Sequence, residues 1–239
     1  MYDINFRVCT SHTDAEGKLK LVSAIDMMQD CSQMWMECEP VLGNYFRDNR
    51  IVQMLISRQA DVRRLPVYGE KITARTTIFE IMGFQGFRNT VIYDGENKPC
   101  IVSWSTGAFV NLETGRLAKV PKEILDSVRM SGKIEMEYLG KKIALPALPG
   151  EELDPVPVKR RDIDFNRHMN NARYVEVSAE YLPEDFAVSR LRIEHKKAAK
   201  YGDSLYPRMI RGGADTIFIL LSDGAGNPYT IMEFTGKSA

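Results

Sequence analysis

The chain has 239 residues, of which 44% are hydrophobic and 27% are charged. Its 32 basic side chains balance 32 acidic ones, so the formal net charge is zero. This composition is typical of a globular protein, and a neutral chain has no long-range field that attracts nucleic acid. The composition therefore argues against a general nucleic-acid-binding protein.

The absence of recognisable targeting signals and the spacing of the cysteines predict a cytoplasmic protein. Residues 1–14 contain no basic segment followed by an apolar run, and no stretch of about 18 consecutive apolar residues occurs in the sequence. We therefore expect neither secretion nor a membrane span. The cysteines lack the paired spacing of a zinc site, so we expect reduced thiols at Cys9, Cys31, Cys38 and Cys100.

The first half of the chain is predicted to form a strand, a long helix and an antiparallel sheet. Apolar residues recur every three or four positions over 20–38, which indicates a helix, and most of its methionines are expected in the core. Alternation of apolar and polar residues over 52–63 predicts a strand with one solvent-exposed face. Further strands are predicted at 70–81, 86–94 and 100–110.

The second half repeats this order after a connection. A short helical stretch at 123–128 is followed by a Gly- and Pro-containing segment that is typical of a linker. A strand at 156–162 and a helix at 171–182 come next. The remaining strands are predicted at 190–199, 204–212, 215–222 and 228–235.

Local landmarks support a duplication. Tyr68-Gly69 returns 133 residues later as Tyr201-Gly202, Asp94 returns after 129 residues as Asp223, and Asp14 returns after 150 residues as Asp164. We therefore predict an α+β fold of two tandem repeats, fused side by side, each with a long helix wrapped by a bent antiparallel sheet. The repeats are expected at 1–128 and 156–239, with a linker at 129–155.

The densest polar cluster is the run from Asp164 to Asn171, directly before the second predicted helix. One interpretation is helix capping, in which Asn170 or Asn171 accepts from free backbone N–H groups. The other is a site that stabilises negative charge on a carbonyl oxygen at the helix N-terminus. Asp164, Asn166 and His168 would then supply acid, base and orienting groups.

The run DIDFNRHMNNARY resembles the Asp-x-Asn-x-His-x-Asn-Asn-x-x-Tyr signature of acyl-[acyl-carrier-protein] thioesterases, which have a double hotdog fold. Two further segments are similar to this family, SHTDAEGKLKLVSAIDMMQD and WSTGAFVNLETGRLAKVPKEI. The resemblance implies hydrolysis of a fatty acyl thioester on acyl carrier protein, without a metal or other cofactor. It also implies that acyl carrier protein is the partner.

The same resemblance implies roles for individual residues. Asn166 and His168 would be catalytic, with Asp164 as a further polar partner. Asn170, Asn171 and Glu176 are expected to contact substrate. One active site would lie in the second repeat, because Asp14 in the first repeat lacks the Asn-His pair, and the first repeat would hold the acyl tail.

One departure from the family concerns the general base. Relatives carry a Glu or a Cys shortly before the second Gly-Asp pair, whereas this chain has Ala198 and Ala199 there. Neither side chain can attack a carbonyl or take a proton. The base would then be Asp164 or His168 acting on water, or a displaced carboxylate such as Glu194 or Glu176.

Basic residues surround the predicted site and would suit an acidic carrier protein: Arg160, Arg161, Arg167, Lys196, Lys197 and Lys200. Two alternatives stay open, an acyl-coenzyme A thioesterase and a weakly active module that binds acyl groups or carrier protein. Acyl chain length cannot be derived from the sequence, and a homodimer is also left open.

Overall fold

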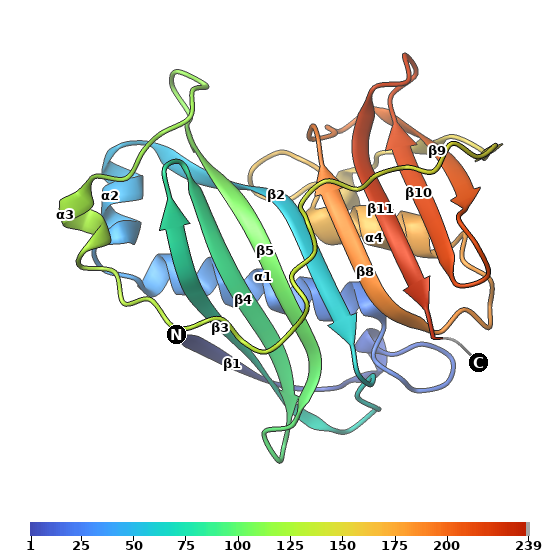
Figure 1. The fold of residues 1–239 in the computed structure, drawn as a ribbon, viewed down its shortest axis with the longest axis horizontal. Coiled ribbons are helices and arrows are strands. Elements are labelled where there is room, and N and C mark those ends of the chain that lie inside the picture. The colour runs from blue at the N-terminus through green and yellow to red at the C-terminus, as the bar shows by residue number, and fades with distance from the viewer. Residues whose placement is uncertain (238–239) are drawn as a thin grey trace. The chain divides into compact units, whose positions relative to one another are not determined.

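The computed structural model describes residues 1–237, which form two compact units. Unit 1 contains Met1–Arg58 and Val62–Leu139, and unit 2 contains Gln59–Asp61 together with the chain from Gly140 onward. Each unit places a helix against an antiparallel sheet (Figure 1).

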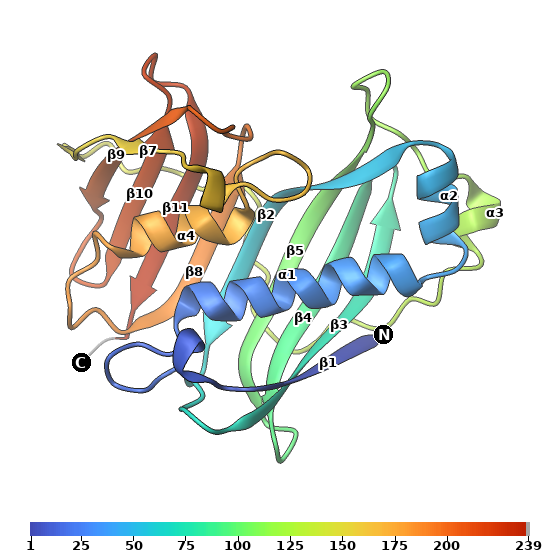
Figure 2. The ribbon, with the colours of Figure 1, turned by 180° about the vertical axis from the view of Figure 1, so that it is seen from behind.

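Unit 1 is built around the helix α1 (Leu21–Cys38). Its strands follow the order β1-β3-β4-β5-β2, and Figure 2 shows α1 lying across one face of β3, β4 and β5. The residues of α1 that face the sheet are buried at the predicted helical spacing, and they include Ala24, Met28, Cys31 and Trp35. The elements of unit 1 besides α1 are β1 (Tyr2–Arg7), α2 (Leu42–Asp48), β2 (Ile51–Val62), β3 (Lys71–Met82), β4 (Gln85–Asp94), β5 (Pro99–Asn111) and α3 (Lys122–Leu125).

Two sequence expectations for unit 1 need correction. The solvent-exposed face predicted for β2 is wrong at its C-terminal half, because Ser57 and Gln59 are buried together with Arg58 and Ala60. The helix α2 was not predicted, since seven residues contain too few turns for a periodic signal. It buries Leu42 and Phe46 in a cluster with Trp35.

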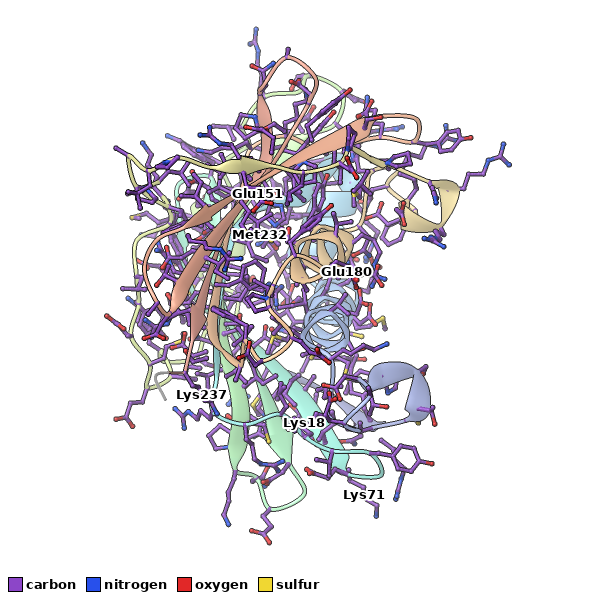
Figure 3. All side chains as sticks on the ribbon, turned by 90° about the vertical axis from the view of Figure 1, so that its right-hand side faces the viewer. Lys18, Lys71, Glu151, Glu180, Met232 and Lys237 are labelled. Atoms are coloured by element: carbon purple, nitrogen blue, oxygen red, sulfur yellow. The ribbon has the colours of Figure 1, made fainter. Side chains whose placement is uncertain are left out.

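Unit 2 repeats the design with the shorter helix α4 (Asn171–Ala179). Its strand order is β8-β11-β10-β9-β6, with β7 also pairing with β9. In the end-on view of Figure 3, α4 lies on one side of the sheet whose strand β11 carries the labelled Met232. The strands are β6 (Glu151–Glu152), β7 (Val156–Pro157), β8 (Val188–His195), β9 (Ser204–Arg211), β10 (Thr216–Ser222) and β11 (Pro228–Gly236).

The predicted strand at 156–162 is wrong over most of its length. Only Val156–Pro157 forms a strand, and Arg160–Asp162 forms a 3-10 turn, in which the Asp162 carboxylate accepts a hydrogen bond of 2.7 Å from the Lys159 N–H. The predicted helix at 171–182 ends earlier, at Ala179. Pro183 follows within one turn and cannot continue a helix.

The connection between the units is packed rather than loose. In unit 1, the Tyr138 hydroxyl donates to Asn89 Oδ1 at 3.0 Å, and its ring contacts Phe79 and Trp104. In unit 2, the Ile143 N–H donates to the buried Glu194 carboxylate at 3.0 Å. Each half of the connection therefore covers a part of its own unit.

The two units match at the level of single hydrogen bonds. Leu19 N–H donates to the Pro66 carbonyl at 2.7 Å, and 150 residues later Met169 N–H donates to the Ala199 carbonyl at 2.8 Å. Short bridges Thr13–Leu19 and Ile163–Met169 close equivalent loops. The side chains of Asp94 and Asp223 organise equivalent turns between strands. The landmark offsets in the sequence thus mark structurally equivalent positions.

Candidate active site

The candidate site is the loop of residues 163–170, which we call the signature loop. Its two ends are joined by the bridge between Ile163 and Met169. Inside it, Asp164 Oδ1 accepts from the Asn166 N–H at 2.8 Å, and the Asp164 N–H donates to the His168 carbonyl at 2.9 Å. Asp164 therefore shapes the turn that presents Asn166 and His168.

A buried tyrosine anchors the segment beneath the loop. The Ala199 carbonyl accepts from Met169, while the Ala199 N–H donates to the Tyr174 hydroxyl at 2.8 Å. Burial raises the pKa of Tyr174 to about 12, so the hydroxyl stays neutral. Sequence reasoning assigned no role to Tyr174, although it is the last position of the signature run.

Asn166 and His168 are available to a ligand. Asn166 is exposed and His168 is half-buried. Within residues 1–237, neither the Asn166 amide nor the His168 imidazole has a hydrogen-bond or ion-pair partner. Two polar side chains that follow one another on a fixed turn, and that the fold does not use, are suited to act on a substrate.

Asn170 caps helix α4. Its Oδ1 accepts from the Ala172 N–H at 2.8 Å, and its carbonyl accepts from the Arg173 N–H at 3.0 Å. The capping interpretation is therefore correct for Asn170, and these two N–H groups are not available to a substrate oxygen. Asn171 is the half-buried first residue of the helix. Stabilisation of a negative charge on a substrate oxygen would then have to come from side chains of the loop and from the field of the helix.

The two displaced carboxylates suggested by the sequence are engaged elsewhere. Glu176 is exposed on α4 and pairs with Arg173 at 2.8 Å. Glu194 is buried, and its oxygens accept from Ile143 N–H and Lys196 Nζ. Ala198 is exposed and Ala199 is buried. Of the carboxylates considered from the sequence, only Asp164 lies within the signature loop.

Unit 1 contains the same loop without the same chemistry. Asp14 Oδ1 accepts from Glu16 N–H at 3.1 Å and from Lys18 N–H at 2.8 Å. At the offset of 150, Glu16 stands where unit 2 has Asn166, and Lys18, labelled in Figure 3, stands where unit 2 has His168. The turn is thus common to both units, whereas the Asn-His pair belongs to unit 2.

The basic residues near the signature loop divide into two sets. Lys196, Lys197 and Arg161 have acidic partners in Glu194, Asp223 and Asp162. Arg160, Arg167 and Lys200 are exposed and form no ion pair within the described chain. The Arg160 guanidinium lies 5.5 Å from the centre of the exposed Tyr201 ring.

The described residues give no sign of a metal site or a membrane-spanning helix. Among residues 1–237, no three His, Cys, Asp or Glu side chains are grouped so that they would hold a metal ion. None of the helices in that range is long and apolar enough to cross a bilayer. All four cysteines are free thiols.

Comparison with known families decides which family the chain belongs to. Residues 1–128 match the family described as Acyl-ACP thioesterase N-terminal domain, and residues 149–228 match Acyl-ACP thioesterase C-terminal domain. The chain belongs to the acyl-ACP thioesterase family. This confirms the resemblance noted in the sequence.

A curated relative and three solved structures are similar to the chain. A chloroplastic palmitoyl-acyl carrier protein thioesterase from Gossypium hirsutum is 21% identical over 214 residues, which cover 82% of this chain and 52% of that protein. The chain thus spans about half the length of this relative. An acyl-ACP thioesterase from Bacteroides thetaiotaomicron matches with a TM-score of 0.86 at 17% identity, covering 98% of this chain and 97% of that one.

The other two structures are equally similar. A putative oleoyl thioesterase from Lactobacillus plantarum gives a TM-score of 0.85 at 18% identity, covering 99% of this chain and 97% of that one. A 12:0-ACP thioesterase from Umbellularia californica gives 0.86 at 16% identity, covering 99% and 96%. These matches confirm the predicted α+β fold with two hotdog repeats.

Proposed function

We propose that the chain hydrolyses the thioester between a fatty acyl group and acyl carrier protein, releasing a free fatty acid. The observation that carries this proposal is the pair Asn166 and His168, presented on a fixed turn and not used by the fold. Membership of the acyl-ACP thioesterase family supports the substrate class.

The signature loop suits the attack of water on a thioester. His168 would take a proton from water as the water oxygen bonds to the thioester carbon, because imidazole exchanges protons near neutral pH. The Asn166 amide would donate to the carbonyl oxygen as negative charge forms there. When the carbon–sulfur bond breaks, protonated His168 would return the proton to the departing thiolate of the phosphopantetheine arm.

Asp164 would serve as a positioning residue in this scheme. Its carboxylate accepts from the backbone of Asn166, as Asp14 does for Glu16 in unit 1, where the Asn-His pair is missing. Asn170 would position α4, which its side chain caps. Asn171, the first residue of this helix, would contact the substrate directly. Glu176, paired with Arg173 on the exposed side of α4, would contact substrate only at the edge of the site.

The surface around the loop would suit an acidic carrier protein. Arg160, Arg167 and Lys200 are exposed cations without acidic partners within residues 1–237, and the Phe165 ring is 79% exposed. Exposed cations attract and orient an acidic partner, and an exposed aromatic ring adds contact area. We assign the acyl tail to unit 1 and the hydrolytic step to unit 2.

Hydrolysis of palmitoyl, lauroyl and octanoyl groups should be measured on acyl carrier protein and on coenzyme A side by side. We expect a higher kcat/KM for the carrier-protein substrates, and the advantage should shrink as salt is raised, because exposed charges are screened. Arg160→Glu, Arg167→Glu and Lys200→Glu should lower kcat/KM for the carrier-protein substrates more than for acyl-coenzyme A, so that this advantage is reduced. Equal rates on both carriers at every salt concentration would contradict the assignment of the partner.

Ala198 favours one alternative, a module that binds acyl groups or carrier protein without turning them over. Neither a carboxylate nor a thiol stands at this position, where the resemblance implies a Glu or a Cys. The same assay separates the alternatives. Binding of acyl carrier protein without release of fatty acid, over many hours and at high protein concentration, would support the module.

A further inference from the structure

Two arginines of unit 1 are buried. Arg58 on β2 is 5% exposed and Arg88 on β4 is 3% exposed. Removing a guanidinium from water is unfavourable unless its charge and its N–H groups are compensated. The groups that compensate these two buried charges must therefore be identified.

The described chain provides little compensation for either charge. Neither arginine forms an ion pair within residues 1–237, and Nε and Nη1 of Arg58 are buried without a hydrogen-bond acceptor there. Arg88 donates one hydrogen bond, to the Thr76 hydroxyl at 3.1 Å, and lies 4.6 Å from the centre of the Trp35 ring. No carboxylate takes part in either set of contacts.

The two charges also oppose one another. Burial lowers the pKa of Arg58 to about 10 and the pKa of Arg88 to about 9. Strands β4 and β2 both flank β5, so the two arginines stand on strands of one sheet that are separated by a single strand, and the charge of Arg58 adds to burial in lowering the pKa of Arg88. A single anion between them would relieve both the burial and the repulsion.

The surroundings of Arg88 combine polar and apolar groups. The Thr76 hydroxyl that accepts from Arg88 lies 3.0 Å from the Thr90 hydroxyl, and Thr90 lies 3.4 Å from Ser32 on α1. Buried apolar residues lie beside Arg88: Ile78 is its cross-strand neighbour and packs in one cluster with Trp35. A bulky dianion such as phosphate requires more hydrogen-bond donors than these residues supply. One carboxylate on an alkyl chain matches both the polar and the apolar groups.

We propose that unit 1 binds a carboxylate carried on an alkyl chain, with Arg58 and Arg88 as its recognition groups. The alkyl part rests on the proposed function, which assigns the acyl tail to unit 1. Two sources share this chemistry. One is a free fatty acid, and the other is an acyl thioester with a second carboxylate at the far end of its chain.

Calorimetric titration of the full chain with octanoate, octan-1-ol and methyl octanoate tests the proposal without any hydrolytic step. We expect octanoate to bind at least ~10-fold more tightly than the alcohol and the ester, since charged hydrogen bonds are the stronger ones. Arg58→Met and Arg88→Met should each remove this preference. Arg75→Met is the matched control, because Arg75 on β3 pairs with Asp3 and is partly exposed, and it should leave the preference unchanged.

Equal affinity of the wild-type protein for octanoate and octan-1-ol would overturn the proposal, and so would a preference that persists in folded Arg58→Met and Arg88→Met variants. Should the methionine variants fail to fold, Arg58→Lys and Arg88→Lys replace them. They should weaken octanoate binding, because lysine lacks the two-pronged geometry of arginine. Octanoate binding that both folded lysine variants leave unchanged would also overturn it.

The source of the carboxylate follows from a second measurement. A far-end carboxylate would give the monothioester of octanedioic acid a higher kcat/KM than the octanoyl thioester, by ~10-fold or more, and Arg58→Met would remove the difference. Tight binding of octanoate without this difference assigns the site to free fatty acid. A protein that prefers octanoate but hydrolyses no thioester would retain this inference while the proposed function fails.

Discussion

The backbone N–H of Ala199 donates a 2.8 Å hydrogen bond to the hydroxyl of Tyr174, deep in unit 2. At the equivalent positions of unit 1 stand Pro66 and Ala24. Proline has no N–H, so unit 1 needs no acceptor there and has none. A buried N–H requires a hydrogen-bond partner. Unit 2 provides an acceptor at this position, whereas unit 1 has no donor.

Tyr174→Phe should lower the free energy of unfolding by about 1–3 kcal/mol, because it leaves the buried Ala199 N–H unpaired. In an Ala199→Pro background the same change should cost much less, since the donor is already gone. Urea unfolding of the wild type, both single variants and the double variant measures the coupling. Equal costs of Tyr174→Phe in both backgrounds would show that the hydrogen bond contributes nothing.

Asn166→Ala and His168→Ala should each lower kcat by ~10² or more, the contribution typical of one acid-base or oxyanion group. The fold should persist, because neither side chain has a hydrogen-bond partner in the described chain. Glu16→Ala and Lys18→Ala are matched controls at the equivalent loop of unit 1 and should retain wild-type kcat. Near wild-type turnover in both Asn166→Ala and His168→Ala would remove this site assignment.

Asp164→Asn should keep activity within ~10-fold of wild type, whereas Asp164→Ala should lower it ~10²-fold, because small displacements of reacting groups are costly. The asparagine side chain retains an oxygen that can accept from the Asn166 N–H. Asp14→Asn and Asp14→Ala report the purely structural cost of the same changes in unit 1. If Asp164→Asn is as inactive as Asp164→Ala, the carboxylate itself is the base.

Ala198→Glu is expected to fold normally and either to raise activity or to leave it unchanged. Ala198 is exposed, so a carboxylate there is not forced out of water. Measurement of kcat/KM for the variant and the wild type distinguishes these two outcomes. Leu65→Glu, at the equivalent position of unit 1, is the control. A well-folded but inactive Ala198→Glu variant would indicate that the small side chain is needed for access of the substrate.

Thiol reagents should not inhibit hydrolysis at pH 7 to 8. Burial raises the pKa of Cys31 and of Cys100 to about 11 each, so thiolate is scarce at these two positions in this range. The other two thiols, Cys9 and Cys38, are exposed but lie outside the signature loop. Raising the pH toward 11 would increase the thiolate fraction and hence the rate of alkylation. Stoichiometric inactivation at neutral pH, prevented by substrate, would reveal a cysteine nucleophile.

Features with a local cause were predictable from the sequence. The periodicity that ends near Cys38 located α1 to within a residue, and the repeated Tyr-Gly pair at 68 and 201 marked true equivalents. Features caused by tertiary contacts were not predictable. The buried Arg58 has the parity of an apolar strand position, and only the three-dimensional packing reveals that both faces of β2 are covered there.

For the site, the sequence placed the polar cluster at the start of a helix but did not separate its roles. Asn170 proved to be a cap because its side chain meets the Ala172 N–H, a matter of geometry rather than of residue type. The sequence left Glu194 as a candidate general base. Its carboxylate accepts a hydrogen bond from the N–H of Ile143, 51 residues earlier in the chain, a contact that the sequence does not reveal. The assignment of Asp164, Asn166 and His168 to catalysis stays a prediction.

Arg167 has a φ of 62°, in a loop where unit 1 has Gly17 with a φ of 73°. Glycine adopts this left-handed conformation freely, while an arginine is strained by it. A glycine at 167 would relax the turn and at the same time erase an exposed positive charge beside the candidate site. Under the proposed function, backbone relaxation would favour glycine at this position while attraction of an acidic partner would favour arginine, so a residue that costs backbone strain would be retained for its charge.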